Sequence, residues 1–167
     1  MTISMFQASA PVFLQALRGV SKVIDKAEAH AQARKIDEQA LLQMRLFPDM
    51  FPFVRQCQVA SDGAKGCMAR LAGQTAPSYE DAESSFAELR GRIAKTMAYV
   101  ESFTPDQIDG SEDRDIVLKF PNGAFEFKGR QFLLGHAIPN VFFHAATAYD
   151  LMRQAGVELG KGDYLGR

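Results

Sequence analysis

Three histidines are the residues in this chain best suited to carry chemistry: His30, His136 and His144. A metal site in a helical bundle normally uses two histidines spaced by three or four residues, because only that spacing places both rings on one face of a helix. His136 and His144 are eight residues apart with Pro139 between them, which is about 12 Å along a helix axis. This spacing does not indicate a shared metal ion, and we expect His136 at the surface near one end of the fold.

His144 is the strongest single candidate for a functional site. It lies beside the apolar stripe of the segment after Pro139, with Asn140 one turn before it. Three interpretations stay open: a partly buried histidine that hydrogen-bonds to a neighbour, a contact to a small ligand, or a metal ligand. We predict that Asn140, His144 and Tyr149 line one crevice between helices. Asp49 is a further candidate for ligand binding.

No metal or other cofactor is expected from the pattern of residues. The alternative is a divalent metal held by an atypical set in which Gln58 or Asp62 joins His144. The remaining carboxylates are expected in helix caps or on polar faces, because no pair of them has a spacing that demands acid-base work. They are Asp49, Asp62, Glu80, Asp81 and Asp150.

The two cysteines, Cys57 and Cys67, lie ten residues apart in one helical segment. That separation is about 15 Å, whereas the Cα atoms of a disulfide lie within about 7 Å of each other. They are therefore expected to be buried, reduced thiols. A nucleophilic pair with His144 stays formally open, although an apolar stripe disfavours the thiolate.

Composition indicates a single cytoplasmic domain over residues 1–167. Hydrophobic residues make up 47% and charged residues 23%, which is typical of a globular protein. The net charge is −1 without a long block of one sign, so nucleic acid is not an expected partner. No apolar run reaches the roughly 20 residues that span a bilayer, and the N-terminus does not resemble a secretory signal. A membrane is therefore not an expected partner.

Four amphipathic segments predict an antiparallel four-helix bundle. Apolar residues in steps of three and four predict helices over 3–33, 50–71, 78–103 and 130–155, with a short helical turn over 37–46. Pro11 either follows the true start of the first helix or kinks it. The expected caps are Asp37, Asp49 and Ser78, and the expected stops are Gly73 and Gly156.

A β-hairpin at about residues 115–128 is predicted as an insertion before the last helix. The period changes there from helical to alternating, and Pro121-Asn122-Gly123 separates two short strands. A two-residue turn at Asn122-Gly123 would pair Phe120 with Phe125, Lys119 with Glu126, and Leu118 with Phe127. After the last helix, the glycine-rich tail is expected to dock through Leu159, Tyr164 and Leu165.

Four short segments connect this chain to a known family. They are RLFPDM at 45–50, PNVFFH at 139–144, AYDLMR at 148–153 and GKGDYLG at 160–166. With them the chain resembles an uncharacterised bacterial family of domains of unknown function, related to the DinB-like four-helix-bundle superfamily. The resemblance spans nearly the whole chain.

The resemblance implies the bundle fold, and it bears on metal binding. DinB-like relatives that bind metal typically use one histidine of the second helix and a His-x-x-x-His pair of the fourth. Here His144 corresponds to the first member of that pair, Ala148 stands at the second position, and the predicted helix over 50–71 contains no histidine. The resemblance therefore implies a degenerate metal site. It also implies a homodimer.

Two functional hypotheses follow. The first is a bundle protein that lacks the metal-dependent activity of its relatives and binds a small molecule near the last helix. The second is a metal-dependent transferase or hydrolase with an atypical ligand set that includes His144. The sequence does not determine whether the protein is an enzyme.

Overall fold

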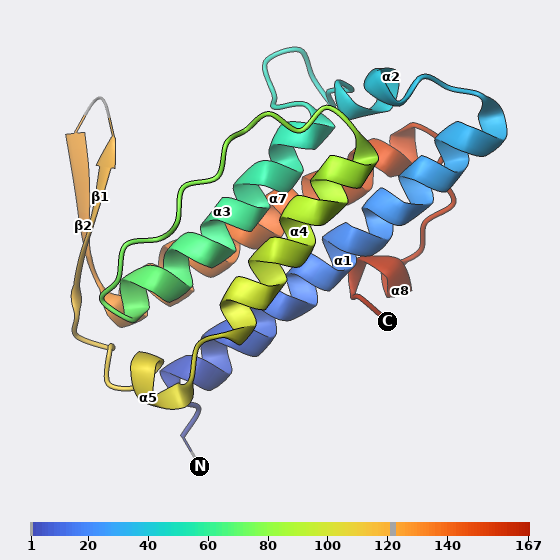
Figure 1. The fold of residues 1–167 in the computed structure, drawn as a ribbon. Helices are drawn as coiled ribbons and strands as arrows, with labels where there is room; N and C mark the ends of the chain where they lie inside the picture. The colour runs from blue at the N-terminus through green and yellow to red at the C-terminus, as the bar shows by residue number, and fades with distance from the viewer. Residues whose placement is uncertain (1, 121–122) are drawn as a thin grey trace.

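The computed structural model describes residues 2–120 and 123–167 and shows a four-helix bundle with a hairpin at one end (Figure 1). The long helices are α1 (Met5–Arg34), α3 (Phe53–Leu71), α4 (Phe86–Glu101) and α7 (Ile138–Gln154). The shorter elements are α2 (Glu38–Leu42), α5 (Pro105–Ile108), β1 (Asp115–Phe120), β2 (Gly123–Lys128), α6 (Gly129–Phe132), the π-helical segment η1 (Leu133–Ala137) and α8 (Lys161–Tyr164). The predicted bundle and inserted hairpin are confirmed.

The connection between α3 and α4 sets the directions of the helices. Residues 73–85 run back along the bundle, so α4 begins at the end where α3 also begins (Figure 1). The rings of Phe53 and Phe86, the first residues of the two helices, are in edge contact there. The helices α3 and α4 are therefore parallel, and α1 and α7 run the other way. Helix α3 packs mainly against α7 and α4, while α4 packs against α1 and α3. No helix among the described residues has the length and apolar character that crossing a membrane requires.

The second long helix starts three residues later than predicted, and Asp49 does not cap it. The cap position of α3 is Pro52, and Asp49 is exposed in the preceding turn. A residue before proline is disfavoured in helical conformation, so Pro52 works against a helix that runs from Asp49 through Phe51. The backbone amide of Phe53 donates to the carbonyl of Met44 at 2.9 Å instead. The cap at Asp37 is confirmed, since its carboxylate accepts from the Gln39 amide at 3.0 Å.

The third long helix also starts later than predicted, and Ser78 does not cap it. Ser85 occupies the cap of α4, and its hydroxyl accepts from the Glu88 amide at 3.1 Å. The Glu88 carboxylate accepts in return from the Ser84 amide at 2.7 Å. Residues 78–84 belong to the extended crossover because their acidic side chains are bound to cations of the bundle, as described below.

The core lies among the four long helices and contains most of the apolar stripes predicted for them. One exception is Ile3, which is 80% exposed because α1 begins only at Met5, with Ser4 as its cap. Pro11 lies inside α1 without ending it. The stops at Gly73 and Gly156 are confirmed, since both glycines have a positive φ just after a helix. The largest fully buried side chains are Phe13, Phe53, Phe86, Phe132, Leu17, Ile24, Leu42, Met68, Leu71, Leu89, Ile93 and Ile108.

The hairpin forms with a different register from the predicted one. Leu118 pairs with Phe125, and the pairing runs from Phe120↔Gly123 to Asp115↔Lys128. The predicted turn includes residue 122, which lies outside the described residues. A shift of two residues leaves every side chain on its original face, so the alternating pattern cannot distinguish the two registers. The observed register joins the strand ends through an ion pair of 2.6 Å between Asp115 and Lys128.

The last helix contains a π-helical segment just before its proline. Residues 130–155 were predicted as one helix broken at Pro139. In the structure α6, η1 and α7 follow one another directly, and Pro139 lies in the first turn of α7. Proline has no amide hydrogen to donate and is tolerated in a first turn. His136 lies within η1.

The tail docks on α1 as predicted. Leu159 is buried, and Tyr164 and Leu165 are partly buried. Asp163 forms an ion pair of 2.8 Å with Lys26. The backbone of Tyr164 lies directly against Gly19, so α8 packs on the outer face of α1.

Candidate functional site

The site around His144 lies between α3 and α7. His144 is 7% exposed, and its Nδ1 lies 2.6 Å from Oε1 of Gln56 on α3. Gln56 in turn donates through Nε2 to the carbonyl of Phe51 at 3.0 Å. This chain of contacts joins the loop before α3 to the middle of α7.

These contacts determine which nitrogen of His144 carries the proton. Because Gln56 donates through Nε2 to a carbonyl, its Oε1 must face the imidazole as an acceptor. Nδ1 of His144 therefore carries the hydrogen of the neutral ring, and Nε2 carries the lone pair. Nε2 makes no hydrogen bond to any described residue. The site thus offers one acceptor for an incoming group.

Aromatic rings and a cation surround this imidazole. Phe51 stacks with it at 6.4 Å between centroids and 22° between planes, and Phe143 meets it edge-on at 5.2 Å. The two phenylalanines are 49% and 56% exposed, which is high for such large apolar rings. The Arg55 guanidinium lies 5.7 Å from the Phe51 ring. Burial lowers the pKa of His144, and the positive charge of Arg55 lowers it further, so the ring is neutral at pH 7.

The lowered pKa of His144 predicts a pH-dependent stability. In the unfolded chain the imidazole regains a pKa of about 6.5, so the unfolded state binds more protons just below that value. The stability that depends on neutral His144 is therefore fully present above about pH 6.5. It is lost as the pH falls through the lower pKa of the folded state. Between about pH 7.5 and pH 5 we expect the melting temperature of the wild type to fall more than that of His144→Gln, measured by circular dichroism. Parallel curves for the two proteins would contradict this expectation.

The four ligand-binding candidates do not line one crevice. Asn140 lies one turn before His144 and borders a separate pocket beneath the hairpin. Tyr149 lies next to the tail, where its ring contacts that of Tyr164 at 5.9 Å. Asp49 is exposed in the loop before α3. Asn140, His144 and Tyr149, which were expected to line one crevice, thus lie at different positions along and around α7.

The atypical metal set is not brought together either. Gln58 and Asp62 lie on the side of α3 that faces α4 and the crossover, where both are bound to other residues. His144 contacts Gln56, two positions earlier on α3. Two helical positions differ by about 200° around the axis, so Gln58 cannot share this face. In the described parts of the chain, no three His, Cys, Asp or Glu side chains form a group that could hold a metal ion.

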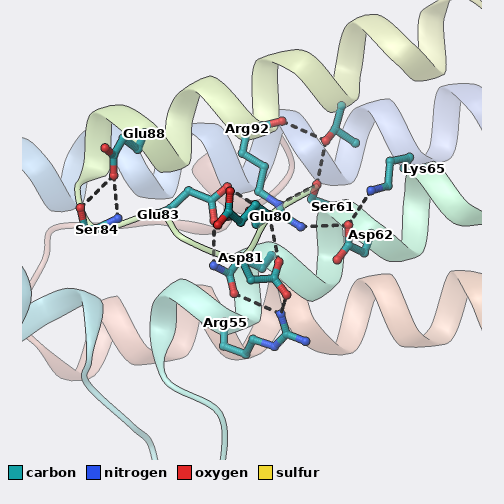
Figure 2. Close-up of polar contacts among 12 residues, drawn as sticks. Arg55, Ser61, Asp62, Lys65, Glu80, Asp81, Glu83, Ser84, Glu88 and Arg92 are labelled. Atoms are coloured by element: carbon teal, nitrogen blue, oxygen red, sulfur yellow. Dashed lines mark hydrogen bonds and ion pairs between the residues drawn. The ribbon is translucent and has the colours of Figure 1, made fainter. Parts of the chain in front are cut away.

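A cluster of charged side chains around Arg92 was missed by the sequence analysis (Figure 2). Arg92 on α4 is 4% exposed. Its Nη2 lies 2.9 Å from Oδ1 of Asp62, and its Nη1 lies 3.0 Å from both Asp81 and Glu83. We call these four residues the Arg92 cluster. They join α3, α4 and the crossover.

Two further cations complete the balance of charge. Lys65 binds Asp62 at 2.8 Å, and Arg55 forms an ion pair with Asp81 (Figure 2). Three cations thus oppose three carboxylates.

Burial works against the charge of Arg92, but its hydrogen bonds and the nearby carboxylates outweigh burial and raise its pKa. Nη1 donates to the Glu80 carbonyl and to the Glu83 carboxylate, while Nη2 lies at ion-pair distance from Asp62 without a hydrogen bond to any described residue. The guanidinium therefore holds the crossover against the bundle.

The sequence contained a signal for Arg92. Leu89, Ile93 and Thr96 lie three or four residues from one another and are all buried, and Arg92 lies on the same stripe. A buried arginine requires carboxylate partners, and Asp81 and Glu83 stand in the preceding loop. Sequence analysis placed Asp62 and Asp81 in caps or on polar faces, because the crossover that brings them to Arg92 was not predicted.

The cysteines are buried and free, as predicted. Desolvation raises the pKa of both the Cys57 and the Cys67 thiols far above the ordinary value. A thiolate at either position is therefore strongly disfavoured.

Comparison with known proteins shows where this fold belongs. The family model described as domain of unknown function (DUF1993) matches residues 5–165. The chain belongs to the DUF1993 family. This DUF1993 chain is similar to a protein of known crystal structure, described as a DinB family member protein from Shewanella denitrificans at 1.83 Å resolution. The two share 40% sequence identity over 97% of this chain and 92% of that one, with a TM-score of 0.88. No curated protein matches.

Proposed function

We propose that this DUF1993 protein binds a small aromatic molecule that carries a hydrogen-bond donor, with His144 as the acceptor. One observation carries the proposal: His144 is neutral and fixed by Gln56 through Nδ1, while Nε2 is left without a partner among the described residues. A polar atom that is held in place at the edge of a core, and that makes no hydrogen bond within the protein, is the kind of group that orients a ligand.

The surrounding rings define the class of ligand. Phe51 and Phe143 offer aromatic surface on two sides of the imidazole. Aromatic pairs add about 0.5–1.5 kcal/mol beyond the burial of their area. A phenolic hydroxyl donating to Nε2, with its ring against these phenylalanines, uses both features of the site. Arg55 beside Phe51 disfavours a cationic ligand.

A binding experiment with 4-methylphenol tests the proposal. We expect saturable binding by isothermal titration calorimetry, and binding at least about tenfold weaker for 4-methylanisole, since the ether cannot donate and leaves Nε2 unpaired. His144→Ala should lower the affinity for 4-methylphenol to that for 4-methylanisole. His30→Ala is the control because His30 lies on α1, away from this site. Equal affinity for phenol and anisole, or for wild type and His144→Ala, would refute the proposal.

Metal-dependent transfer or hydrolysis is the second candidate, and the same histidine supports it. Histidines that bind metal usually donate their other ring hydrogen to a carbonyl or carboxylate, which fixes the orientation of the ring. Nδ1 of His144 donates to an amide oxygen in this way. Elemental analysis of untagged protein, purified without chelator, distinguishes the candidates. Near one zinc, nickel or iron per chain, lost in His144→Ala, would favour the metal-dependent candidate.

A further inference from the structure

A pocket distinct from the His144 site lies where the hairpin meets the bundle. It has a volume of about 200 Å³. Its walls come from α3, β1, η1 and the start of α7, near the end of the bundle that carries the hairpin (Figure 1). Leu118 and Phe132 supply apolar surface, while Arg70, His136 and Asn140 supply polar groups.

Three polar side chains of the lining are available to a ligand: Arg70 is exposed, and His136 and Asn140 are partly buried. Arg70, His136 and Asn140 form neither a hydrogen bond nor an ion pair with any described residue through their side chains. The guanidinium of Arg70 is held only by the ring of Phe132, at 6.0 Å from its centroid. By contrast, Arg55, Arg90 and Arg92 all form ion pairs. Unused hydrogen-bonding groups that line one pocket indicate a place for a polar ligand.

The π-helical segment brings His136 into this pocket. His136 was expected at the surface, but it is partly buried and its ring stacks on Phe132 at 5.6 Å and 18°. The ring of Phe127 on β2 contacts it from another side, at 5.5 Å. Single-turn π-helical segments occur frequently at functional sites. Here η1 is an independent feature that coincides with the pocket.

Gly63 on α3 lies beside Asn140 and Val141 at the wall of the pocket. A Cβ atom at Gly63 would lie 3.5 Å from Nδ2 of Asn140 and 2.9 Å from Val141. The tight contact is therefore with Val141, and the Asn140 amide lies at ordinary van der Waals distance from α3. Its hydrogens stay available to a ligand because the backbone of a helix interior has no free acceptor there.

The charges of the pocket favour an anion with one negative charge. Arg70 contributes a positive charge that no carboxylate of residues 2–120 and 123–167 pairs with. The only carboxylate in the lining is that of Asp62, and its Oδ1 is bound by Lys65 at 2.8 Å and by Arg92 at 2.9 Å. Guanidinium groups bind carboxylates through paired hydrogen bonds. The apolar surface of Leu118 and Phe132 requires that the anion carry a short apolar or aromatic body.

We propose that this pocket binds a small monocarboxylate with an apolar or aromatic body, with Arg70 on the carboxylate, Asn140 donating to it, and the body against Phe132 and His136. The site is independent of the phenol site at His144, because the two use different side chains. Benzoate is the probe that combines the required charge, ring and size.

The test is a titration with benzoate followed by the imidazole signals in NMR spectra. The chain has three histidines, so His136→Gln assigns the relevant signal. We expect benzoate to shift the His136 signal in a saturable way and to leave that of His30 in place. Arg70→Met should lower the affinity for benzoate by about tenfold or more, since the substitution removes a charge-assisted hydrogen bond. Arg34→Met is the matched control, because both arginines lie in the last turn of a long helix.

Neutral and inorganic probes separate the possible outcomes. Benzamide should bind at least about tenfold more weakly than benzoate if the charge is recognised. His144→Ala should leave benzoate binding unchanged. Equal binding of benzamide, an unchanged affinity in Arg70→Met, or a His136 signal that does not move would overturn the proposal. Inorganic phosphate that binds as tightly as benzoate would also overturn it, because the apolar body would then play no part.

Discussion

Arg92→Met is expected to lower the free energy of unfolding by about 2–4 kcal/mol. Removing one partner of a buried ion pair typically costs about 3–5 kcal/mol, because the remaining charges are left without compensation. We expect a smaller loss here, since the side chains of Asp62 and Asp81 are 38% and 39% exposed and water can reach them. The Glu83 side chain is only 12% exposed, so loss of its partner leaves this carboxylate with the least compensation from water. Urea denaturation followed by circular dichroism measures the change.

Arg90→Met is the matched control for this prediction. Arg90 lies two residues earlier on the same helix and also binds two carboxylates, those of Asp25 and Glu28. Its side chain is 37% exposed, and exposed ion pairs contribute about 0–1 kcal/mol. Arg92→Met should also increase hydrogen exchange in the crossover over residues 74–84, which Arg90→Met should not. Equal losses of stability in the two variants would show that the Arg92 cluster does not hold the crossover.

Gly19→Ala and Gly91→Ala are expected to change stability in opposite directions. Both glycines lie inside long helices, where alanine is favoured over glycine by about 0.5–1 kcal/mol. A Cβ atom at Gly91 would have nothing within 4 Å, so Gly91→Ala should stabilise the protein by that amount. A Cβ atom at Gly19 would lie 2.1 Å from the carbonyl oxygen of Tyr164. Because that contact is to backbone, α8 must move away, and we expect a net loss of about 1–3 kcal/mol.

Truncation of the tail tests this explanation. In a chain that ends at Leu159 the carbonyl of Tyr164 is absent, so Gly19→Ala should become stabilising, like Gly91→Ala. Thermal melting of the four proteins gives the comparison. If Gly19→Ala destabilises the truncated chain as much as the full one, the tail is not the cause of its effect.

Local sequence patterns were sufficient for the helices, for the cap at Asp37 and for the existence of the hairpin. Apolar residues at helical spacing predicted all four long helices because burial of one face stabilises most helices of a globular protein. The same patterns misplaced helix starts at Asp49 and Ser78. A residue that can cap a helix does not by itself start one. Pro52 disfavours helical conformation at Phe51, and Ser85 caps α4 in place of Ser78.

Part of the candidate site was also predictable. The position of His144 beside a core stripe indicated a partly buried ring between helices, and its ring lies buried between α3 and α7. The identity of its partner was not predictable, because Gln56 and Gln58 are both glutamines on the same helix. Gln56 and Gln58 lie at different angles around α3. Which of them faces α7 depends on how the two helices pack.

The sequence by itself determined the four long helices, the presence of the hairpin, most of the apolar core and the resemblance to a helical-bundle family. The tertiary structure alone decided which polar groups meet. Helix formation depends on residues three or four positions apart, whereas the Arg92 cluster joins residues up to 30 positions apart through a crossover. The pocket at Arg70 likewise needs the hairpin and η1 to lie against α3. Such contacts depend on the directions and rotations of whole helices, and a one-dimensional pattern does not contain them.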